Sequence, residues 1–453
     1  MLPGVFIGRE REAQVLEELH GSEKPELFVL FGRRRVGKTE LLQRFCHGRR
    51  AVYFLAAQVR ERDNLRAFRD ALAEGLGDDV AASVEFRDWS GALAYAAERA
   101  KGQRLVVVLD EFPYLCESSK GLTSQIQRFW DTRGKSSKLM LVLCGSQVSF
   151  MEKEVLAERS PLFGRRTGQR RLEPLEPRDA LRFFPRWPVE QGVLGYAILG
   201  GMPAYLRRFD DGRSLRENVE REVLRPEGYL FEEVQFLLRS ELASPATYNS
   251  ILAAVARGAQ RVGEVALDVG VDSTTANKYL HVLRELRLVE REVPITDPDP
   301  LRSRRGRYRI RDRFVAFHFR HIQPNASLVH AGRGAKVFEE FIEPDLPRLL
   351  DEARADLVLA HLRREAAGLL EDEVVEAGRF GGRYVRAVGR TAGDRAVAAL
   401  TPGAGAGAEA RAANELAEVA SAFSLPMVQL RYRLTSDHDA PLAVEVASIA
   451  RPG

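Results

Sequence analysis

Short, unbroken apolar runs punctuate the first third of the chain. The runs at 27–31, 105–109 and 139–144 contain only apolar residues, and each is followed directly by a glycine or an aspartate. Strands of a parallel sheet have this composition, because helices cover both of their faces. The pattern therefore predicts an α/β fold with buried parallel strands whose ends carry polar residues.

A different pattern starts near residue 245. Apolar residues recur at helical spacing from Tyr248 to Val255, a second short helix is predicted at 262–269, and a third at 273–287 follows a tight turn. The segment 291–296 and the basic segment 302–311 flank a Pro/Asp-rich turn and predict a β-hairpin. Three helices followed by a hairpin indicate a winged helix-turn-helix.

The third of these helices has a polar stripe of the kind that contacts double-stranded DNA. Its side chains are small hydroxyl, amide or basic groups, which reach phosphates and base edges in a major groove. The hairpin adds eight arginines against one aspartate between 301 and 320, a local charge of +7. Packing of the winged helix against the rest of the chain is the alternative. The DNA candidates are Thr274, Asn277, Lys278, His281, Arg302, Arg304, Arg305 and Arg307.

Composition limits the class of protein. The chain has 453 residues, of which 45% are hydrophobic, and the 68 Lys and Arg nearly balance the 64 Asp and Glu to give +4. Two or three domains are expected at this length. We expect no membrane span, no export signal and a cytoplasmic location; three cysteines without C-x-x-C spacing indicate free thiols.

The segment after the first apolar run has the spacing of a phosphate-binding loop. It reads G-x-x-x-x-G-K-T and consists of Gly32, Arg33, Arg34, Arg35, Val36, Gly37, Lys38 and Thr39. In such a loop the backbone N–H groups surround the phosphates, the lysine reaches the β/γ oxygens and the Thr hydroxyl ligates Mg²⁺. The helix starting at Glu40 adds its positive dipole end. The three arginines are either solvated or sense phosphate or a neighbouring subunit.

The second and third apolar runs end in further candidates. Asp110 is predicted to hold the Mg²⁺ shell, and Glu111 to polarise the attacking water. Ser146 or Gln147, at the tip of the third run, is a candidate nucleotide sensor, with a capped turn as the alternative.

Several motifs together resemble the archaeal-type ATPases, on the STAND and AAA+ side of the P-loop NTPases. They are Phe6-Ile-Gly-Arg-Glu10, the loop at 32–39, Leu109-Asp-Glu-Phe-Pro-Tyr-Leu115, Cys144-Gly-Ser146, Ser160-Pro-Leu-Phe-Gly-Arg-Arg166, Gly200-Gly-Met-Pro-Ala-Tyr-Leu206 and Tyr308-Arg-Ile-Arg-Asp312. The resemblance implies a three-layer P-loop NTPase core at 1–172, a helical lid at 173–243 and a winged helix at 244–325. It also implies that Gly8 and Arg9 lie beside the adenine, that Pro203 covers the base, and that Arg165 or Arg166 approaches the γ-phosphate.

Members of this family commonly end in a domain resembling the PD-(D/E)xK nucleases, and residues 326–453 are expected to form such an α/β domain. Its chemistry needs an Asp and a Glu-x-Lys on adjacent strands. The last lysine of this chain is Lys336, so the Glu-x-Lys is missing and no nuclease activity is expected.

The sequence thus predicts a Mg²⁺-dependent ATPase that binds ATP and ADP and acts as a molecular switch coupled to its winged helix. Two alternatives stay open. One is a nucleotide-bound scaffold without hydrolysis, which binds a protein partner or itself, and the other is a DNA-directed regulator or mobile-element protein.

Overall fold

A computed structural model describes residues 6–449, apart from positions 243, 296, 298, 300–301, 381, 383, 402–406 and 424. The chain divides into two compact units, Met1–Pro174 and Leu175–Gly453, each with its own hydrophobic core. Within the described part of the chain, no helix combines the length and the apolar character needed to cross a membrane.

A five-stranded parallel sheet forms the centre of the first unit, in the order β2-β3-β4-β1-β5. Its strands are β1 (Glu26–Phe31), β2 (Ala51–Leu55), β3 (Leu105–Asp110), β4 (Leu139–Gly145) and β5 (Gly168–Arg171). The three apolar runs form β1, β3 and β4, in which every residue is buried. Because parallel strands all end at one edge, the segments that follow these three neighbouring strands lie together.

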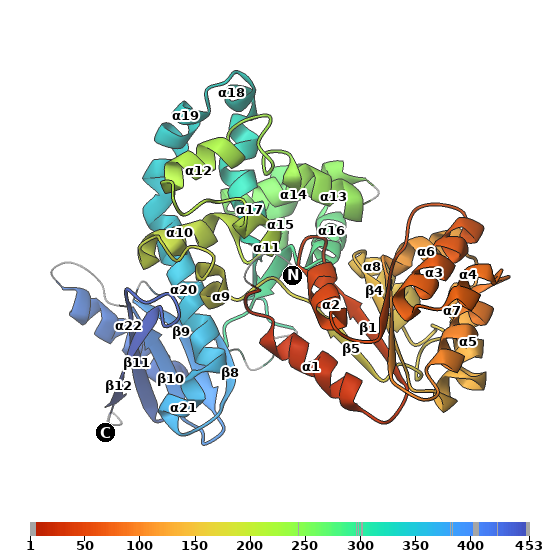
Figure 1. The fold of residues 1–453 in the computed structure, drawn as a ribbon. Helices are drawn as coiled ribbons and strands as arrows, with labels where there is room; N and C mark the ends of the chain where they lie inside the picture. Colours follow the sequence, from red (N-terminus) through yellow and green to blue (C-terminus); the bar gives the residue numbers. More distant parts are fainter. Residues whose placement is uncertain are drawn as a thin grey trace. The chain divides into compact units, whose positions relative to one another are not determined.

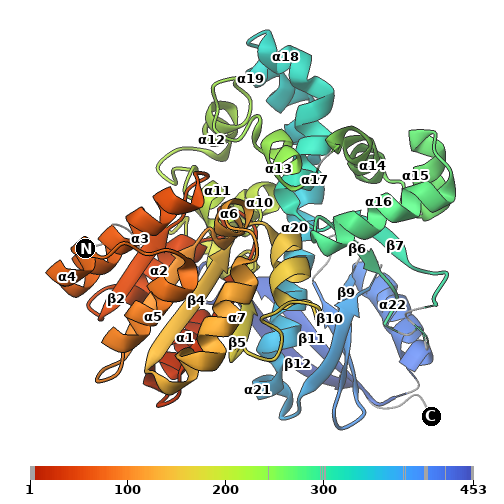
Figure 2. The same ribbon diagram turned by 90° about the vertical axis from the view of Figure 1, so that its right-hand side faces the viewer.

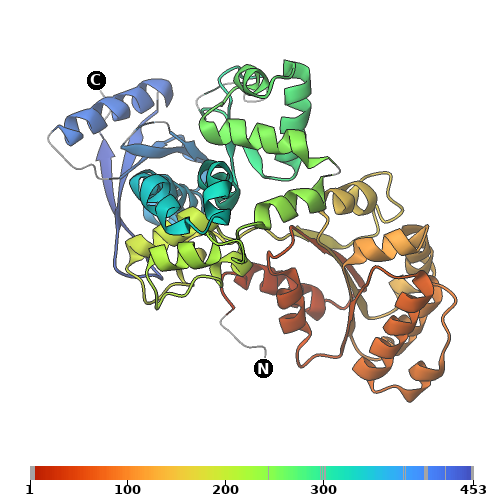
Figure 3. The same ribbon diagram turned by 90° about the horizontal axis from the view of Figure 1, so that it is seen from above.

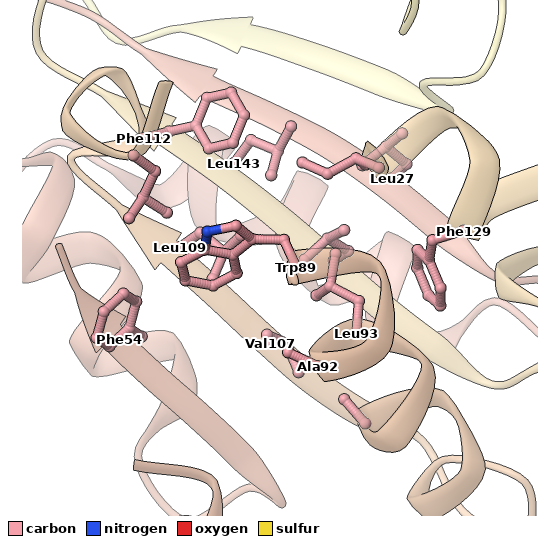
Figure 4. Packing of buried hydrophobic residues seen from close by; sticks show 14 of the residues in the cluster. Leu27, Phe54, Trp89, Ala92, Leu93, Val107, Leu109, Phe112, Phe129 and Leu143 are labelled. Atoms are coloured by element: carbon pink, nitrogen blue, oxygen red, sulfur yellow. The ribbon is translucent and has the colours of Figure 1, made fainter. Parts of the chain in front are cut away.

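Helices cover both faces of this sheet (Figures 1 and 2). One face carries α1 (Glu10–Gly21) and α2 (Lys38–Cys46), and the other carries α3 (Glu61–Leu76), α5 (Trp89–Arg99) and α7 (Leu122–Thr132). Trp89 lies at the centre of the second face, beside Phe54 and Leu109 (Figure 4). The predicted three-layer α/β class is therefore confirmed for this unit. Shorter elements are α4 (Asp79–Ser83), α6 (Phe112–Ser118), α8 (Val148–Phe150), the 3₁₀ turn η1 (Gly134–Ser136) and the π-helix η2 (Met151–Leu156).

The second unit begins with helices. They are α9 (Pro177–Leu181), α10 (Val189–Leu199), α11 (Pro203–Leu206), α12 (Leu215–Glu222) and α13 (Glu233–Glu241). α10 is apolar on nearly all sides, and it is buried because α9, α17 (Arg313–Phe317) and α20 (Leu346–Arg364) pack around it.

Three helices and a two-stranded ribbon follow in the predicted winged-helix segment. They are α14 (Pro245–Arg257), α15 (Val262–Val269), α16 (Ser273–Glu285), β6 (Val289–Glu292) and β7 (Arg307–Ile310), with β6 antiparallel to β7. Both strands are shorter than the predicted 291–296 and 302–311. Pro294 has no N–H to donate, so the first strand ends before it. Thr296 lies outside the described residues.

A helical connection leads from the ribbon to α20. It consists of α17, the π-helix η3 (His318–Ile322), η4 (Gln323–Asn325), α18 (Ala326–His330), α19 (Gly334–Val337), η5 (Phe338–Ile342) and η6 (Glu343–Asp345). The aromatic stretch from Phe314 to Phe319 faces the core, and His318 and His321 are buried with it.

The C-terminal part is a second five-stranded sheet between two helices. It consists of α21 (Ala366–Leu370), β8 (Val374–Arg379), β9 (Val385–Thr391), β10 (Ala396–Leu400), α22 (Ala408–Phe423), β11 (Met427–Leu434) and β12 (Leu442–Ile449). The strand order is β12-β11-β10-β9-β8, and only β10 and β11 pair in parallel, because α22 crosses over between them. α20 packs on one face and α22 on the other (Figure 3).

Candidate nucleotide site

The loop between β1 and α2 has a backbone that needs glycine at two positions. Gly32 has a φ of +155°, and a Cβ there would lie 2.4 Å from the carbonyl oxygen of Leu172. Gly37, directly before α2, has a φ of 97°. Residues with a Cβ rarely adopt such values. The two glycines therefore allow the tight turn that a phosphate-binding loop requires.

Lys38 begins α2, and its side chain folds back over the loop. It is 5% exposed, and its Nζ donates hydrogen bonds to the carbonyl oxygens of Gly32 (2.8 Å) and Arg33 (3.0 Å). A buried ammonium group needs partners of this kind. They hold the lysine charge within the loop, where a phosphate group would meet it.

Thr39, in the first turn of α2, meets Asp110 at the end of β3. The Thr39 hydroxyl donates to Oδ2 of Asp110 at 2.8 Å, and the backbone N–H of Glu111 donates to Oδ1 of Asp110 at 2.9 Å. The carboxylate is 1% exposed, so its orientation is fixed by these donors. A hydroxyl and a carboxylate are oxygen ligands suited to Mg²⁺, which takes few protein ligands and fills its octahedron with water and phosphate oxygens. The pair therefore fits the predicted magnesium site.

Glu111 and Ser146 meet across the ends of β3 and β4. Glu111 lies in the left-handed region, with a φ of 53°, and its Oε2 accepts a 2.7 Å hydrogen bond from the Ser146 hydroxyl. Gln147, the other sensor candidate, donates instead to Glu117 at 3.3 Å. The structure thus brings Ser146, and not Gln147, to the predicted general base.

Arg9 connects the loop to the end of the first unit. It is 5% exposed, and its Nη2 donates to the carbonyl oxygens of Val36 (2.9 Å) and Glu173 (2.8 Å). Gly8 precedes it with a φ of 68°. Of the other predicted site residues, Arg34 donates to the Tyr114 hydroxyl at 2.6 Å, Arg33 is buried, and Glu40, in α2, pairs with Arg44.

Comparison with known proteins identifies the family. Residues 6–209 match the model of an ATPase domain found predominantly in Archaea. An uncharacterised protein of Methanocaldococcus jannaschii is 34% identical over 330 residues, which cover 72% of this chain and 71% of that protein. The chain belongs to this archaeal-type ATPase family.

Two further relatives agree with this assignment. An uncharacterised ATP-binding protein of Methanocaldococcus jannaschii is 39% identical over 46 residues, which cover 10% of this chain and 78% of that protein. The structure of a Walker-type ATPase of Pyrococcus abyssi is 22% identical, covers 70% of this chain and 96% of that one, and superimposes with a TM-score of 0.53. The latter likeness concerns the fold.

The arginines that the archaeal-type ATPase pattern assigns to the γ-phosphate have other partners in this chain. Arg165 pairs with Asp131 at 2.8 Å, and Arg166 donates to the carbonyl oxygens of Val155 (3.4 Å) and Leu156 (3.0 Å). Among the described residues, no hydrogen bond or ion pair joins either arginine to the loop at 32–39. Pro203, the predicted cover of the base, begins α11 in the second unit.

Sequence reasoning missed Tyr53, on β2. Its hydroxyl donates to Oδ2 of Asp110, the same oxygen that Thr39 contacts. Burial raises the pKa of the Tyr53 phenol, and the Asp110 charge raises it further, so the group stays protonated. The two residues come together because β2 pairs with β3. This pairing is a long-range feature that no local motif predicts. A lone tyrosine in an apolar strand was the only signal.

The predicted DNA-contacting residues of this family member lie on the surface of the second unit. Thr274, Asn277, Lys278 and His281 are exposed on α16, and Arg302, Arg304, Arg305 and Arg307 are exposed in the wing.

The +7 charge attributed to the wing is an overestimate. Arg309 pairs with Glu290 and Glu292, Arg313 with Glu352 and Asp356, and Arg320 with Asp345. Arg302 also pairs with Asp299, at 4.0 Å. Acidic residues therefore pair with four of the eight arginines. Arg304, Arg305 and Arg307 of the predicted set stay exposed.

Proposed function

We propose that the protein is a Mg²⁺-dependent ATPase in which the nucleotide state of the first unit controls the second. The Thr39–Asp110 and Ser146–Glu111 contacts carry the proposal, because they bring a magnesium-binding pair and a general base to one edge of a parallel sheet. Membership of an ATPase family supports the same activity.

Each residue has a distinct task in this account. Backbone N–H groups of the loop and the Lys38 ammonium bind the β- and γ-phosphates, and Thr39 and Asp110 hold Mg²⁺, which neutralises phosphate charge when it is bound. Glu111 accepts a proton from the attacking water as the oxygen approaches the γ-phosphorus. Ser146 orients the carboxylate that receives this proton.

Arg9 supports the coupling between nucleotide and second unit. One guanidinium nitrogen binds a carbonyl of the phosphate loop and the carbonyl of Glu173, which directly precedes the boundary at Pro174. A shift of the loop on nucleotide binding would therefore act on the chain where it leaves the ATPase unit. In this proposal residues 173–243 serve as the lid, 244–325 as the winged helix and 326–453 as the terminal domain.

Steady-state hydrolysis and nucleotide binding test the enzymatic part. Lys38→Ala should lose nucleotide binding, because the phosphates lose their buried cation. Glu111→Gln should bind ATP as tightly as the wild type while turnover falls at least about 100-fold, the contribution of a general base. Unchanged turnover in Glu111→Gln would contradict the proposal. Binding without turnover in the wild type would favour the scaffold alternative.

DNA binding by the second unit is a second candidate. The exposed polar stripe of α16 and the exposed Arg304 and Arg305 at the wing tip favour it. Duplex binding through these groups should weaken steeply as salt rises, because phosphate contacts release counterions. Arg304→Glu with Arg305→Glu should weaken it at every DNA sequence. Glu substitution at the exposed Arg207 and Arg213, outside the winged-helix segment, is the charge-matched control. DNA binding that does not weaken as salt rises, or equal losses of DNA affinity in both double variants, would contradict this role.

A further inference from the structure

Tyr53 occupies a position in β2 from which it reaches the predicted magnesium site of the same unit. β2 pairs in parallel with β3, with Tyr53 opposite Val108 and Leu55 opposite Asp110. The Tyr53 phenol thus lies two residues short of the strand end and extends along the strand to the Asp110 carboxylate. Phe54, its neighbour in sequence, points to the opposite face of the sheet and joins the aromatic cluster around Trp89.

The Asp110 carboxylate is held by donors on both oxygens. Oδ2 accepts the hydroxyls of Tyr53 and Thr39, and Oδ1 accepts the backbone N–H of Glu111. Three donors from three different segments leave this carboxylate little freedom to rotate. Thr39 must turn a lone pair of its hydroxyl oxygen toward a cation in order to ligate it, and its O–H must then keep donating to Asp110. The Tyr53 hydroxyl keeps the accepting oxygen in place for that bond.

The geometry points to Tyr53 as a positioning residue of the magnesium site, which sets the orientation of Asp110 and through it that of Thr39. This inference rests on the proposed function, since it concerns the metal of the same ATPase site. It predicts a specific defect: without the phenol hydroxyl the site needs more Mg²⁺, whereas the phosphate loop still binds nucleotide.

The test uses the full chain with Tyr53→Phe, which keeps the ring and removes one oxygen. ATP binding and hydrolysis are measured as a function of Mg²⁺ concentration, and ATP binding is also measured in EDTA. We expect the Mg²⁺ midpoint to rise on the order of five-fold or more, as for the loss of a hydrogen bond to a charged acceptor. Affinity for ATP in EDTA should stay that of the wild type.

Tyr95→Phe is the matched control. The Tyr95 hydroxyl also donates to an aspartate, Asp78 at 2.7 Å, but this pair belongs to the α4–α5 region of the first unit and has no contact to the loop at 32–39 among the described residues. Tyr95→Phe should leave the Mg²⁺ midpoint unchanged. Asp110→Asn provides a double-mutant cycle: if Tyr53 acts through Asp110, adding Tyr53→Phe to this variant should shift the midpoint no further.

The outcomes separate this inference from the proposed function. A wild type that binds no ATP with or without Mg²⁺ would refute the proposed function itself. If the wild type shows Mg²⁺-dependent binding or turnover, an unchanged midpoint in Tyr53→Phe would overturn the role of Tyr53 alone. Equal losses of ATP affinity with and without Mg²⁺ would also overturn it, and so would a Tyr53→Phe variant that fails to fold. In both cases the hydroxyl would be a structural element of the sheet.

Discussion

The Ser146 hydroxyl donates a 2.7 Å hydrogen bond to Oε2 of Glu111, and so the tip of β4 fixes the side chain that follows β3. Because the backbone of Glu111 is in the left-handed region, with a φ of 53°, its side chain has a defined direction, and the serine fixes its end. Ser146→Ala should therefore lower kcat about ten-fold, a part of the contribution of an oriented general base, while KM for ATP changes little.

Ser118→Ala is the control for this variant. The Ser118 hydroxyl donates to the carbonyl of Leu115, within α6, and should be dispensable for turnover. Steady-state kinetics of the two variants give the comparison. A kcat of wild-type size in Ser146→Ala would show that the serine only caps its strand.

Gly32 should tolerate no larger residue. Gly32→Ala would place a Cβ 2.4 Å from the carbonyl oxygen of Leu172, at a φ of +155°. We expect this variant to lose about 2 kcal/mol or more of stability in the first unit, together with ATP binding, because the backbone on both sides is fixed. Gly21→Ala, at the end of α1, has open space and is the control. Chemical denaturation measures both; equal stability of the two variants would refute the close approach.

His318 should make the second unit sensitive to acid. Burial lowers its pKa from 6.5 to about 4, and among the described residues neither ring nitrogen has a hydrogen-bond partner. The folded state thus binds the proton less readily than the unfolded state. The contribution of neutral His318 to the free energy of unfolding is therefore complete above about pH 6.5. It falls by about 1.4 kcal/mol per pH unit between pH 6.5 and pH 4.

Denaturation of the second unit at pH 7 and pH 5 measures this effect. His318→Phe should flatten the decline in stability between these values. His281→Gln, at an exposed histidine of α16, should leave it unchanged. A decline of the same size in His318→Phe and in the wild type would assign the acid sensitivity to other groups.

Arg9 should matter for coupling more than for catalysis. Arg9→Met removes the donors to Val36 and Glu173 and keeps much of the side-chain volume. ATP turnover should persist within a few-fold. The change in hydrogen exchange that nucleotide causes at 172–176 should be lost. Arg11→Met, at an exposed neighbour on α1, is the control. Loss of turnover without loss of this change in hydrogen exchange would place Arg9 in the nucleotide site instead.

Local patterns predicted the parts of the site that lie next to each other in sequence or follow a strand end. The loop at 32–39, Asp110 and Glu111 are of this kind, because strand ends in a parallel sheet always share an edge. Tyr53 and the partners of Arg309 and Arg313 could not be predicted in this way. Their positions depend on which strands and helices become neighbours in the fold, and the sequence contains no local signal for such pairings.

In the proposed function, ATP bound in the first unit alters the second. Hydrogen exchange of the full chain measures this most directly, with Glu111→Gln holding ATP and Mg²⁺ and the wild type holding ADP. We predict that protection changes at 32–39, at 172–176 and in segments of the second unit, and that Lys38→Ala abolishes all three changes. Protection that changes only at 32–39 would contradict the coupling and leave a nucleotide-bound ATPase without a switch.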